Sequence, residues 1–292
     1  MDRSINKILL PINFPSSAPR VIDQAVYLAR HFQSEIILLH VLSAWGHPEA
    51  LLEDGHELKE RGSWAESVKR AQQDLNQVLQ PEPDGVAVRR LLRTGHPARE
   101  ISRTARDERV DLIMMSTHHH GVLYRLLLGS LTAKVLHDGN CSVWVDTHLE
   151  ASPAREFTVR NVLCAVDLRA HSHHTVSGAL QIASAFDARL TLVHVTPGVE
   201  TYGPGGTHMV PEWKELLVGG ATKAVAKLQQ DLGTGADVII ESGHLHTSLN
   251  AAAAQSKADL MVIGHLPSGG HLGENGSGYS IIRASHVPVL SL

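Results

Sequence analysis

The sequence predicts two copies of one α/β domain, each built on a parallel β-sheet with helices on both faces. Short runs rich in valine, isoleucine and leucine alternate with longer amphipathic segments along the 292 residues. Buried parallel strands have such continuous apolar runs, and helices connect them. The same series of segments occurs twice, and the length suits two domains of ordinary size.

The internal repeat rests on five pairs of similar segments that keep the same order in both halves, which indicates duplication. We therefore predict a domain over residues 1–148, a linker over 149–158 that contains Ser152 and Pro153, and a second domain over 159–292. The matching pairs are residues 7–14 with 161–168, 38–41 with 192–195, Gly95 with Gly243, 111–114 with 259–262, and 142–145 with 288–291.

Periodicity and helix-start signals place the elements of each half. The first helix is expected to begin near Pro19, with Ser16 or Ser17 as its cap. A capping box at residues 63–66 predicts a second helix that reaches about residue 79. Two more helices are expected over 97–108 and 130–136. The expected strands are 8–13, 35–42, 86–92, 111–116 and 142–146. In the second half, helices are expected near 175–186, 212–232, 248–256 and 279–284.

The composition excludes several classes of protein. A net charge of −4 without a basic stripe gives no reason to expect nucleic acid. No apolar run approaches the roughly 20 residues of a membrane helix, and the first residues lack a signal-peptide core. Cys141 and Cys164 cannot build a disulfide framework and suit a reducing compartment. We therefore expect a cytoplasmic protein.

Several of the repeated segments resemble the universal stress protein family. The resemblance covers nearly the whole chain in family order. It implies for each half an open five-stranded parallel sheet in the order 3-2-1-4-5, flanked by helices, of the adenine-nucleotide alpha-hydrolase-like type. The segments that carry it are Leu39-His40-Val41, Gly95-His96-Pro97-Ala98, residues 111–118, residues 125–130, Ala165-Val166-Asp167, His194-Val195, residues 259–264 and Val287-Pro288-Val289-Leu290.

The resemblance also implies a ligand site at the carboxyl ends of the strands. In ATP-binding members of the family, adenine lies near the ends of strands one and two. The phosphates lie on a loop of pattern Gly-x2-Gly-x9-Gly-Ser/Thr after strand four. Glycine lets the backbone approach a phosphate closely, and the helix that follows offers free N–H groups and a favourable dipole. Such a crevice lies where the strand order reverses.

The first half keeps only part of this pattern. Gly129-Ser130 lies at the expected helix start, but Ser116 and His119 occupy the earlier glycine positions, and Asn13 stands where the family has aspartate. Two interpretations remain open. One is a modified nucleotide pocket in which His119 donates a hydrogen bond to phosphate; the other is a degenerate loop that keeps only a well-capped helix.

The second half keeps a different part. Asp167 and Gly264 match the pattern, but Pro267 has no N–H to offer at the second glycine position. Gly276-Ser277 falls one residue early, and Glu274 adds a negative charge near the phosphate position. For ATP itself, these departures favour a mobile loop without a ligand. Asp167 equally suits a ligand contact or a turn that caps the next helix.

His40 and His194 lie at matching strand ends, and we interpret both as partly buried histidines bonded to backbone. Val41 and Val195 would then offer backbone groups to a base. The expected ligand is ATP or AMP. The residues predicted to contact it are Ile12, Asn13, Val41, Ser116, Thr117, His119, Gly129, Ser130, Asp167, Val195, Gly264, Gly276 and Ser277.

Other chemistry is less well supported. Twenty histidines suggest zinc binding, although no helical His-x3-His or Cys-x2-Cys pair occurs among them. The sequence contains no nucleophile elbow and no Walker-type loop, so we expect no catalytic residue. Any ATP hydrolysis is expected to be weak at most. Cys164 and the tryptophans are interpreted as packing residues. The histidines expected in second-half loops are His171, His173, His174, His244, His246, His265 and His271.

The sequence therefore predicts a universal stress response protein that binds an adenine nucleotide or a related small ligand as a regulatory switch. The alternative is a nucleotide-free scaffold, or a metal- or pH-responsive module, with degenerate sites. The apolar fifth strands, 142–146 and 287–292, would end each sheet with an edge that needs protection. We expect these edges to pair within the chain or across a homodimer.

Overall fold

The computed structural model describes residues 5–13, 19–43, 64–116, 130–138, 141–146, 157–198, 200–203, 206–209, 211–264 and 277–292. The chain forms two compact units, one within residues 4–144 and the other within residues 145–292. The first half comprises the described residues up to Asp146, the end of β5, and the second half those from residue 157 onward. The predicted domain limits at 148 and 159 stay a prediction.

The first half has its strands in the order β3-β2-β1-β4-β5, which is the predicted order 3-2-1-4-5. Strand β1 pairs in parallel with β2 and β4, and β2 pairs in parallel with β3. The chain reverses its direction of travel across the sheet between β1 and β4. The elements are β1 (Lys7–Pro11), α1 (Pro19–Phe32), β2 (Glu35–Leu42), α2 (Trp64–Gln77), β3 (Ala87–Thr94), α3 (Pro97–Asp107), β4 (Leu112–Ser116), α4 (Ser130–Asp138) and β5 (Ser142–Asp146).

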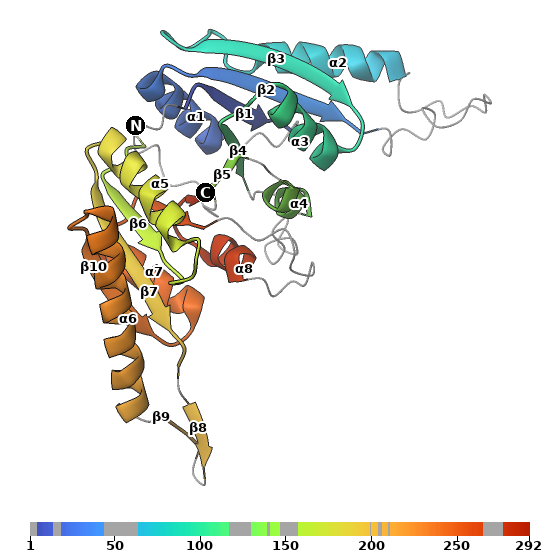
Figure 1. Ribbon diagram of the computed structural model, residues 1–292. Helices are drawn as coiled ribbons and strands as arrows, with labels where there is room; N and C mark the ends of the chain where they lie inside the picture. Colours follow the sequence, from blue (N-terminus) through green and yellow to red (C-terminus); the bar gives the residue numbers. More distant parts are fainter. Residues whose placement is uncertain are drawn as a thin grey trace. The chain divides into compact units, whose positions relative to one another are not determined.

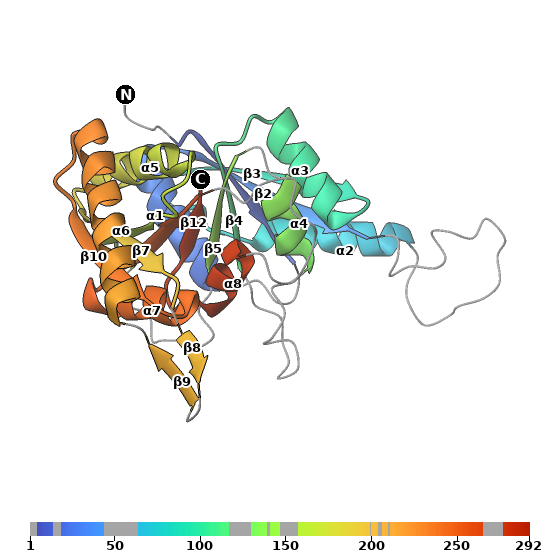
Figure 2. The ribbon, with the colours of Figure 1, turned by 60° about the horizontal axis from the view of Figure 1, so that its bottom comes forward.

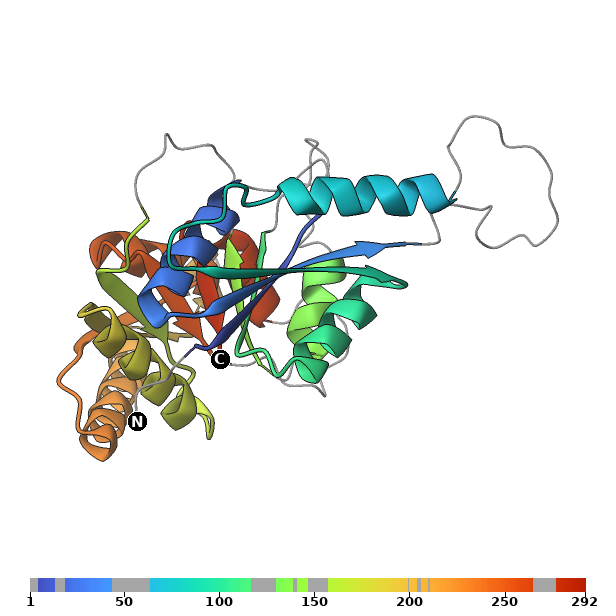
Figure 3. The same ribbon diagram turned by 90° about the horizontal axis from the view of Figure 1, so that it is seen from above.

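Helices cover both faces of the first sheet. Helix α1 packs on β1, β2 and β4, and α2 on β2 and β3, while α3 packs on β2 and beside α4. Figure 3 shows α1 (blue) and α2 (cyan) on one side of these strands, and α3 and α4 (green) on the other. In the core, the Trp144 indole donates a hydrogen bond of 2.8 Å to Gln24 of α1, which confirms a packing role for this tryptophan.

The second half repeats this architecture in the order β10-β7-β6-β11-β12, with β6–β7, β6–β11, β7–β10 and β11–β12 parallel. Helices α5 and α6 pack on one face, and α7 and α8 lie together on the other (Figure 2). The elements are β6 (Asn161–Ala165), α5 (Ser172–Ala185), β7 (Arg189–Thr196), α6 (Pro211–Leu232), β10 (Asp237–Ser242), α7 (Leu245–Gln255), β11 (Leu260–Ile263), α8 (Ser277–Ala284) and β12 (Val289–Ser291).

One pair of strands was not predicted. Strands β8 (Glu200–Gly203) and β9 (Gly206–Met209) form an antiparallel hairpin between β7 and α6. Figure 1 shows this hairpin beyond the end of β7, beside the start of α6. It belongs to the connection that follows the second strand of the repeat.

The predicted parallel α/β fold is confirmed in both halves, and most element limits agree within two residues. Two helices begin earlier than predicted, at Ser172 and at Leu245. His171 and His244 precede these helices, and neither makes a side-chain cap hydrogen bond, so no capping residue marks the two helix starts in the sequence. In the part of the chain that the structure describes, no helix combines the length and hydropathy needed to cross a membrane.

Candidate functional site

A histidine fastens the end of strand one to strand two in both halves. In the first half, the Ile12 amide donates to the Leu39 carbonyl at 2.8 Å, and His40 Nδ1 lies 2.8 Å from the Ile12 carbonyl oxygen. In the second half, the Val166 amide donates to the Val193 carbonyl at 2.9 Å, and His194 Nδ1 lies 2.7 Å from the Val166 carbonyl oxygen. We call this arrangement the histidine clamp.

The clamp fixes the role of both histidines. A carbonyl oxygen only accepts hydrogen bonds, so Nδ1 of each imidazole must carry the proton that it donates. The prediction that His40 and His194 bond to backbone is thereby confirmed. The clamp engages both the amide and the carbonyl of Ile12, so this residue sets the position of Asn13, which follows it and is exposed.

Asp167 forms the turn between β6 and α5. Its Oδ1 accepts hydrogen bonds from the Arg169 amide at 3.0 Å and from the Ser172 hydroxyl at 2.9 Å. Leu168, between them, has a positive φ of 59°. The turn-forming role, one of the two interpretations of Asp167, is therefore present. Its other oxygen, Oδ2, lies 4.0 Å from Nε of Arg169, and the Asp167 side chain as a whole is 62% exposed at the strand end.

Gly264 follows β11, on the neighbouring strand. Cys164 of β6 pairs with Val262 of β11, so Gly264, two residues on, lies level with Val166, next to Asp167. A Cβ added at Gly264 would lie 2.9 Å from Thr175 Oγ1 of α5. Thr175 is buried, and its hydroxyl donates to the His171 carbonyl at 3.2 Å. Packing against α5 therefore requires glycine here, a constraint that the loop pattern did not reveal.

The ends of strands two and three approach each other closely. The Gly95 amide donates to the Leu42 carbonyl at 2.9 Å, and the Gly243 amide to the Thr196 carbonyl at 3.1 Å. Both glycines have positive φ, 145° and 129°. A Cβ on Gly198 would lie 3.4 Å from the Gly243 Cα. The repeated Gly95–Gly243 pair thus meets a backbone requirement of this turn.

Val41 and Val195 occupy matching positions, one residue before the ends of β2 and β7. Beside Val195 lies a polar pair that was not predicted, Thr196 and Ser242, whose hydroxyl oxygens are 2.7 Å apart. The Thr196 hydroxyl also lies within 3.2 Å of the Glu241 carbonyl. The Ser-Gly step after the third strand is the only signal in the sequence that pointed to this pair.

The predicted phosphate loops lie largely outside the described residues, and these include Thr117, His119, Gly129 and Gly276. Ser116 is the last residue of β4, and Ser130 and Ser277 are the first residues of α4 and α8. Helices α4 and α8 thus follow the strands β4 and β11 along the chain, and the loop pattern itself stays a prediction. A helix start offers free N–H groups to an anion.

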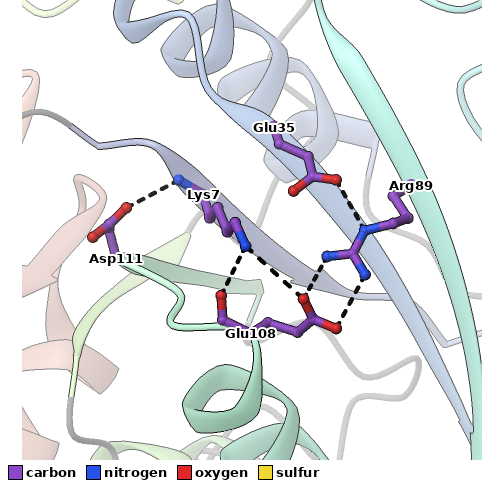
Figure 4. Close-up of polar contacts among 5 residues, drawn as sticks. All are labelled: Lys7, Glu35, Arg89, Glu108 and Asp111. Atoms are coloured by element: carbon purple, nitrogen blue, oxygen red, sulfur yellow. Dashed lines mark hydrogen bonds and ion pairs between the residues drawn. The ribbon is translucent and has the colours of Figure 1, made fainter.

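The amino ends of the strands in the first sheet, which we call the amino edge, carry a network of ion pairs (Figure 4). Arg89 donates to Glu35 at 2.9 Å and to both Glu108 oxygens at 3.0 and 2.6 Å, while Lys7 Nζ donates to the Glu108 carbonyl. Hydrogen bonds from Arg89 lower the pKa of Glu108, and those to Glu108 and Glu35 raise the pKa of Arg89. Each of these charged side chains is paired with an opposite charge of the same network. We therefore interpret the network as a structural feature of the sheet.

An aspartate joins strands one and four at the same edge in both halves. Asp111 Oδ2 accepts the amides of Asn6 and Lys7 at 2.8 and 3.0 Å, and Asp259 Oδ2 accepts those of Arg160 and Asn161, both at 2.9 Å. These contacts explain why the repeat keeps an aspartate before strand four.

Within the described ranges, no three His, Cys, Asp or Glu side chains gather in a way that would hold a metal ion. The placement of three histidines in loops was wrong, because His173 and His174 lie in α5 and His246 lies in α7. The neighbouring His265 and His271, like residues 118–120, fall outside the described residues. Burial raises the pKa of the Cys164 thiol to about 12, which supports its interpretation as a core residue.

Comparison with known proteins agrees with the twofold architecture. A family model described as the universal stress protein family matches residues 4–146 and again residues 158–291. A universal stress protein of Methanocaldococcus jannaschii is 30% identical over 154 residues, which are 48% of this chain and 93% of that protein.

Solved structures that match nearly the whole chain show the same fold. A universal stress protein from Archaeoglobus fulgidus covers 99% of this chain and 96% of its own, with 20% identity and a TM-score of 0.71. A universal stress protein in complex with cAMP matches 46% of this chain and 97% of its own, with 23% identity and a TM-score of 0.33.

Proposed function

Because the chain belongs to the universal stress protein family, whose model matches both halves, we propose that it binds an adenine nucleotide, ATP or AMP, or a related small ligand, as a regulatory switch. The observation that carries the proposal is the pair of neighbouring strand ends in the second half. The exposed carboxylate of Asp167 lies at the end of β6, level with Gly264 after β11. This is where the strand order reverses, the position of ligand crevices in open α/β sheets.

We assign the ligand to the second half. Asp167 holds Oδ1 in the turn, while Oδ2 has only a long contact of 4.0 Å to the exposed Arg169. Oδ2 can therefore accept a hydrogen bond from a ribose hydroxyl. Helix α8 then begins after a glycine-rich segment and presents its free N–H groups to phosphate. In the first half, Asn13 and Ser116 supply neither the charge nor the glycine.

The first half would then serve as a scaffold, the alternative that the sequence left open. Its histidine clamp and strand order match those of the second half. Val41, Ser116, Thr117, His119, Gly129 and Ser130 would be the contacts if this half also took a nucleotide. The cytoplasmic location and the pairing of the fifth-strand edges are further expectations, testable by cell fractionation and by measuring the mass in solution.

Calorimetric titration of the full chain with ATP, and separately with AMP, tests the proposal. We expect one nucleotide per chain. Asp167→Ala should weaken binding roughly tenfold or more, since a hydrogen bond to a charged group contributes about 1.5–3 kcal/mol. Ser172→Ala, which removes a turn contact but keeps the carboxylate, should bind almost normally. Asn13→Ala provides the matched change in the first half and should leave binding unchanged.

Three results would count against this assignment. If neither nucleotide binds at millimolar concentration, nucleotide binding must be abandoned and the scaffold function takes its place. If Asn13→Ala weakens binding and Asp167→Ala does not, the ligand belongs to the first half. A stoichiometry of two would place a nucleotide in each half.

A further inference from the structure

Helix α6 presents two large apolar side chains to solvent in its first turns. Trp213 is 58% exposed and Leu216 is 69% exposed, so the expected packing role of Trp213 is wrong. Among the described residues, Val238, at 39%, is the only other large apolar side chain with high exposure. Packing involves the later turns, where Ala221, Val225 and Leu228 are buried. We call residues 212–220 the α6 overhang; Figure 1 shows it beside hairpin β8–β9.

The overhang ends in two glycines, Gly219 and Gly220, inside a helix of 22 residues. Glycine in a helix interior is less favourable than alanine, because it loses more conformational freedom. Neither residue has the positive φ that would require glycine, and an added Cβ would meet nothing within 4 Å. No contact within the described chain therefore explains this pair. Small residues on a helix surface let a second backbone approach closely.

The charged residues before the two glycines are acidic on the face that carries the glycines, and those after them are basic. Glu212 and Glu215 precede the pair, and Lys223 and Lys227 follow it, and all four are exposed. Lys214 is also exposed, but the helical period places it on the face opposite the glycines. If a second α6 crossed the first antiparallel at the glycines, each acidic end would face a basic end. The surface is therefore complementary in charge to a copy of itself, as a twofold interface requires.

Among its described residues, the first half shows no such surface. Helix α2, which occupies the same place in its half, begins at Trp64, has 14 residues and contains no glycine. The longer helix, the exposed apolar pair and the glycines thus occur together in the second half alone. We propose that the α6 overhang docks antiparallel against the same segment of a second copy of this chain, with Gly219 and Gly220 at the crossing.

A charge-reversal experiment on the full chain tests this proposal by sedimentation velocity over a range of concentrations. The variants Glu212→Lys/Glu215→Lys and Lys223→Glu/Lys227→Glu should each self-associate at least about tenfold more weakly than wild type, because like charges then meet. An equimolar mixture of the two should associate as heterodimers. The control Lys69→Glu/Arg70→Glu makes the same charge change as the second variant, on α2, and should behave as wild type.

A second variant separates docking from helix stability. Gly219→Ala/Gly220→Ala should raise the thermal stability of the chain, because alanine favours the helix. It should nevertheless weaken self-association at least about tenfold, because two methyl groups then hold the backbones apart. The proposal is overturned if wild type shows no self-association, if the reversed variants associate like wild type, or if mixing them restores nothing. A fifth-strand dimer alone would give the second of these results.

Discussion

The two halves share the contacts that hold strands one, two and four together, and they differ in the side chains around those contacts. The histidine clamp and the aspartate before strand four occur in both, with nearly equal distances. At the carboxyl ends, however, Asn13 and Ser116 of the first half correspond to Asp167 and Gly264 of the second. The backbone framework is thus common to both halves, while the side chains at the carboxyl ends of their strands differ.

The amino edges differ in a complementary way. The first half has Arg89 joined to Glu35 and Glu108, whereas the corresponding positions of the second half carry Asp237, Arg189 and Ser256. Arginine and acid have thus exchanged strands, and both Arg189 and Asp237 are exposed. A polar edge of the sheet is needed in both halves, but no particular arrangement of charges is needed to form the fold.

The shared aspartates give the largest expected effect. Asp111→Ala and Asp259→Ala should each lower the free energy of unfolding by about 2–3 kcal/mol, because each leaves two backbone amides without their charged acceptor. Asn at either position keeps one acceptor oxygen and should lose less. Urea unfolding monitored by circular dichroism measures both. Clearly unequal losses in the two halves would show that the duplicated contact does not have the same role in each.

Gly264 gives the next effect and is specific to the second half. Gly264→Ala should cost about 1–2 kcal/mol of unfolding free energy, because the methyl group enters the space of Thr175 Oγ1. The double variant with Thr175→Ala should lose less than the sum of the two single changes, and a double-mutant cycle from thermal unfolding reports this coupling. Strict additivity would show that the two side chains do not compete for space.

Much of this comparison could be predicted from the sequence, because the repeat constrains both halves at once. The positions of strands and helices followed from the periodicity of apolar residues. The order of the strands in the sheet followed only from the family resemblance. The hairpin β8–β9 was not predicted, although the segment Gly203-Pro204-Gly205-Gly206 is a strong turn signal. Its short strands carry no run long enough to indicate an extended segment.

The site was harder to predict, because one residue type serves two purposes. Aspartate is common both in turns and at ligands, so Asp167 could not be assigned before its bonds to Arg169 and Ser172 were known. Gly264 matched a phosphate pattern, but its contact with Thr175 depends on how α5 packs. Such long-range packing leaves no trace in local sequence.

The smallest expected effect concerns the amino edge and depends on pH. Arg89 lowers the pKa of Glu108 through side-chain hydrogen bonds, so their interaction stabilises the fold above the unfolded pKa of glutamate, about 4.3. This stabilisation is lost as the pH falls through the lower folded pKa. Arg89→Met should cost about 1 kcal/mol near neutral pH, a small value because Arg89 is partly exposed and screened by solvent.

The difference between wild type and Arg89→Met should therefore shrink as the pH falls below about 4. Arg189→Met is the matched control in the second half. Arg189 is exposed, and its change should stay within about 0.5 kcal/mol at every pH. Urea unfolding from pH 3 to pH 7 measures both variants. If the two variants had equal pH profiles, Arg89 and Arg189 would contribute equally to the free energy of unfolding. The different arrangement of charges in the two halves would then make no difference to stability.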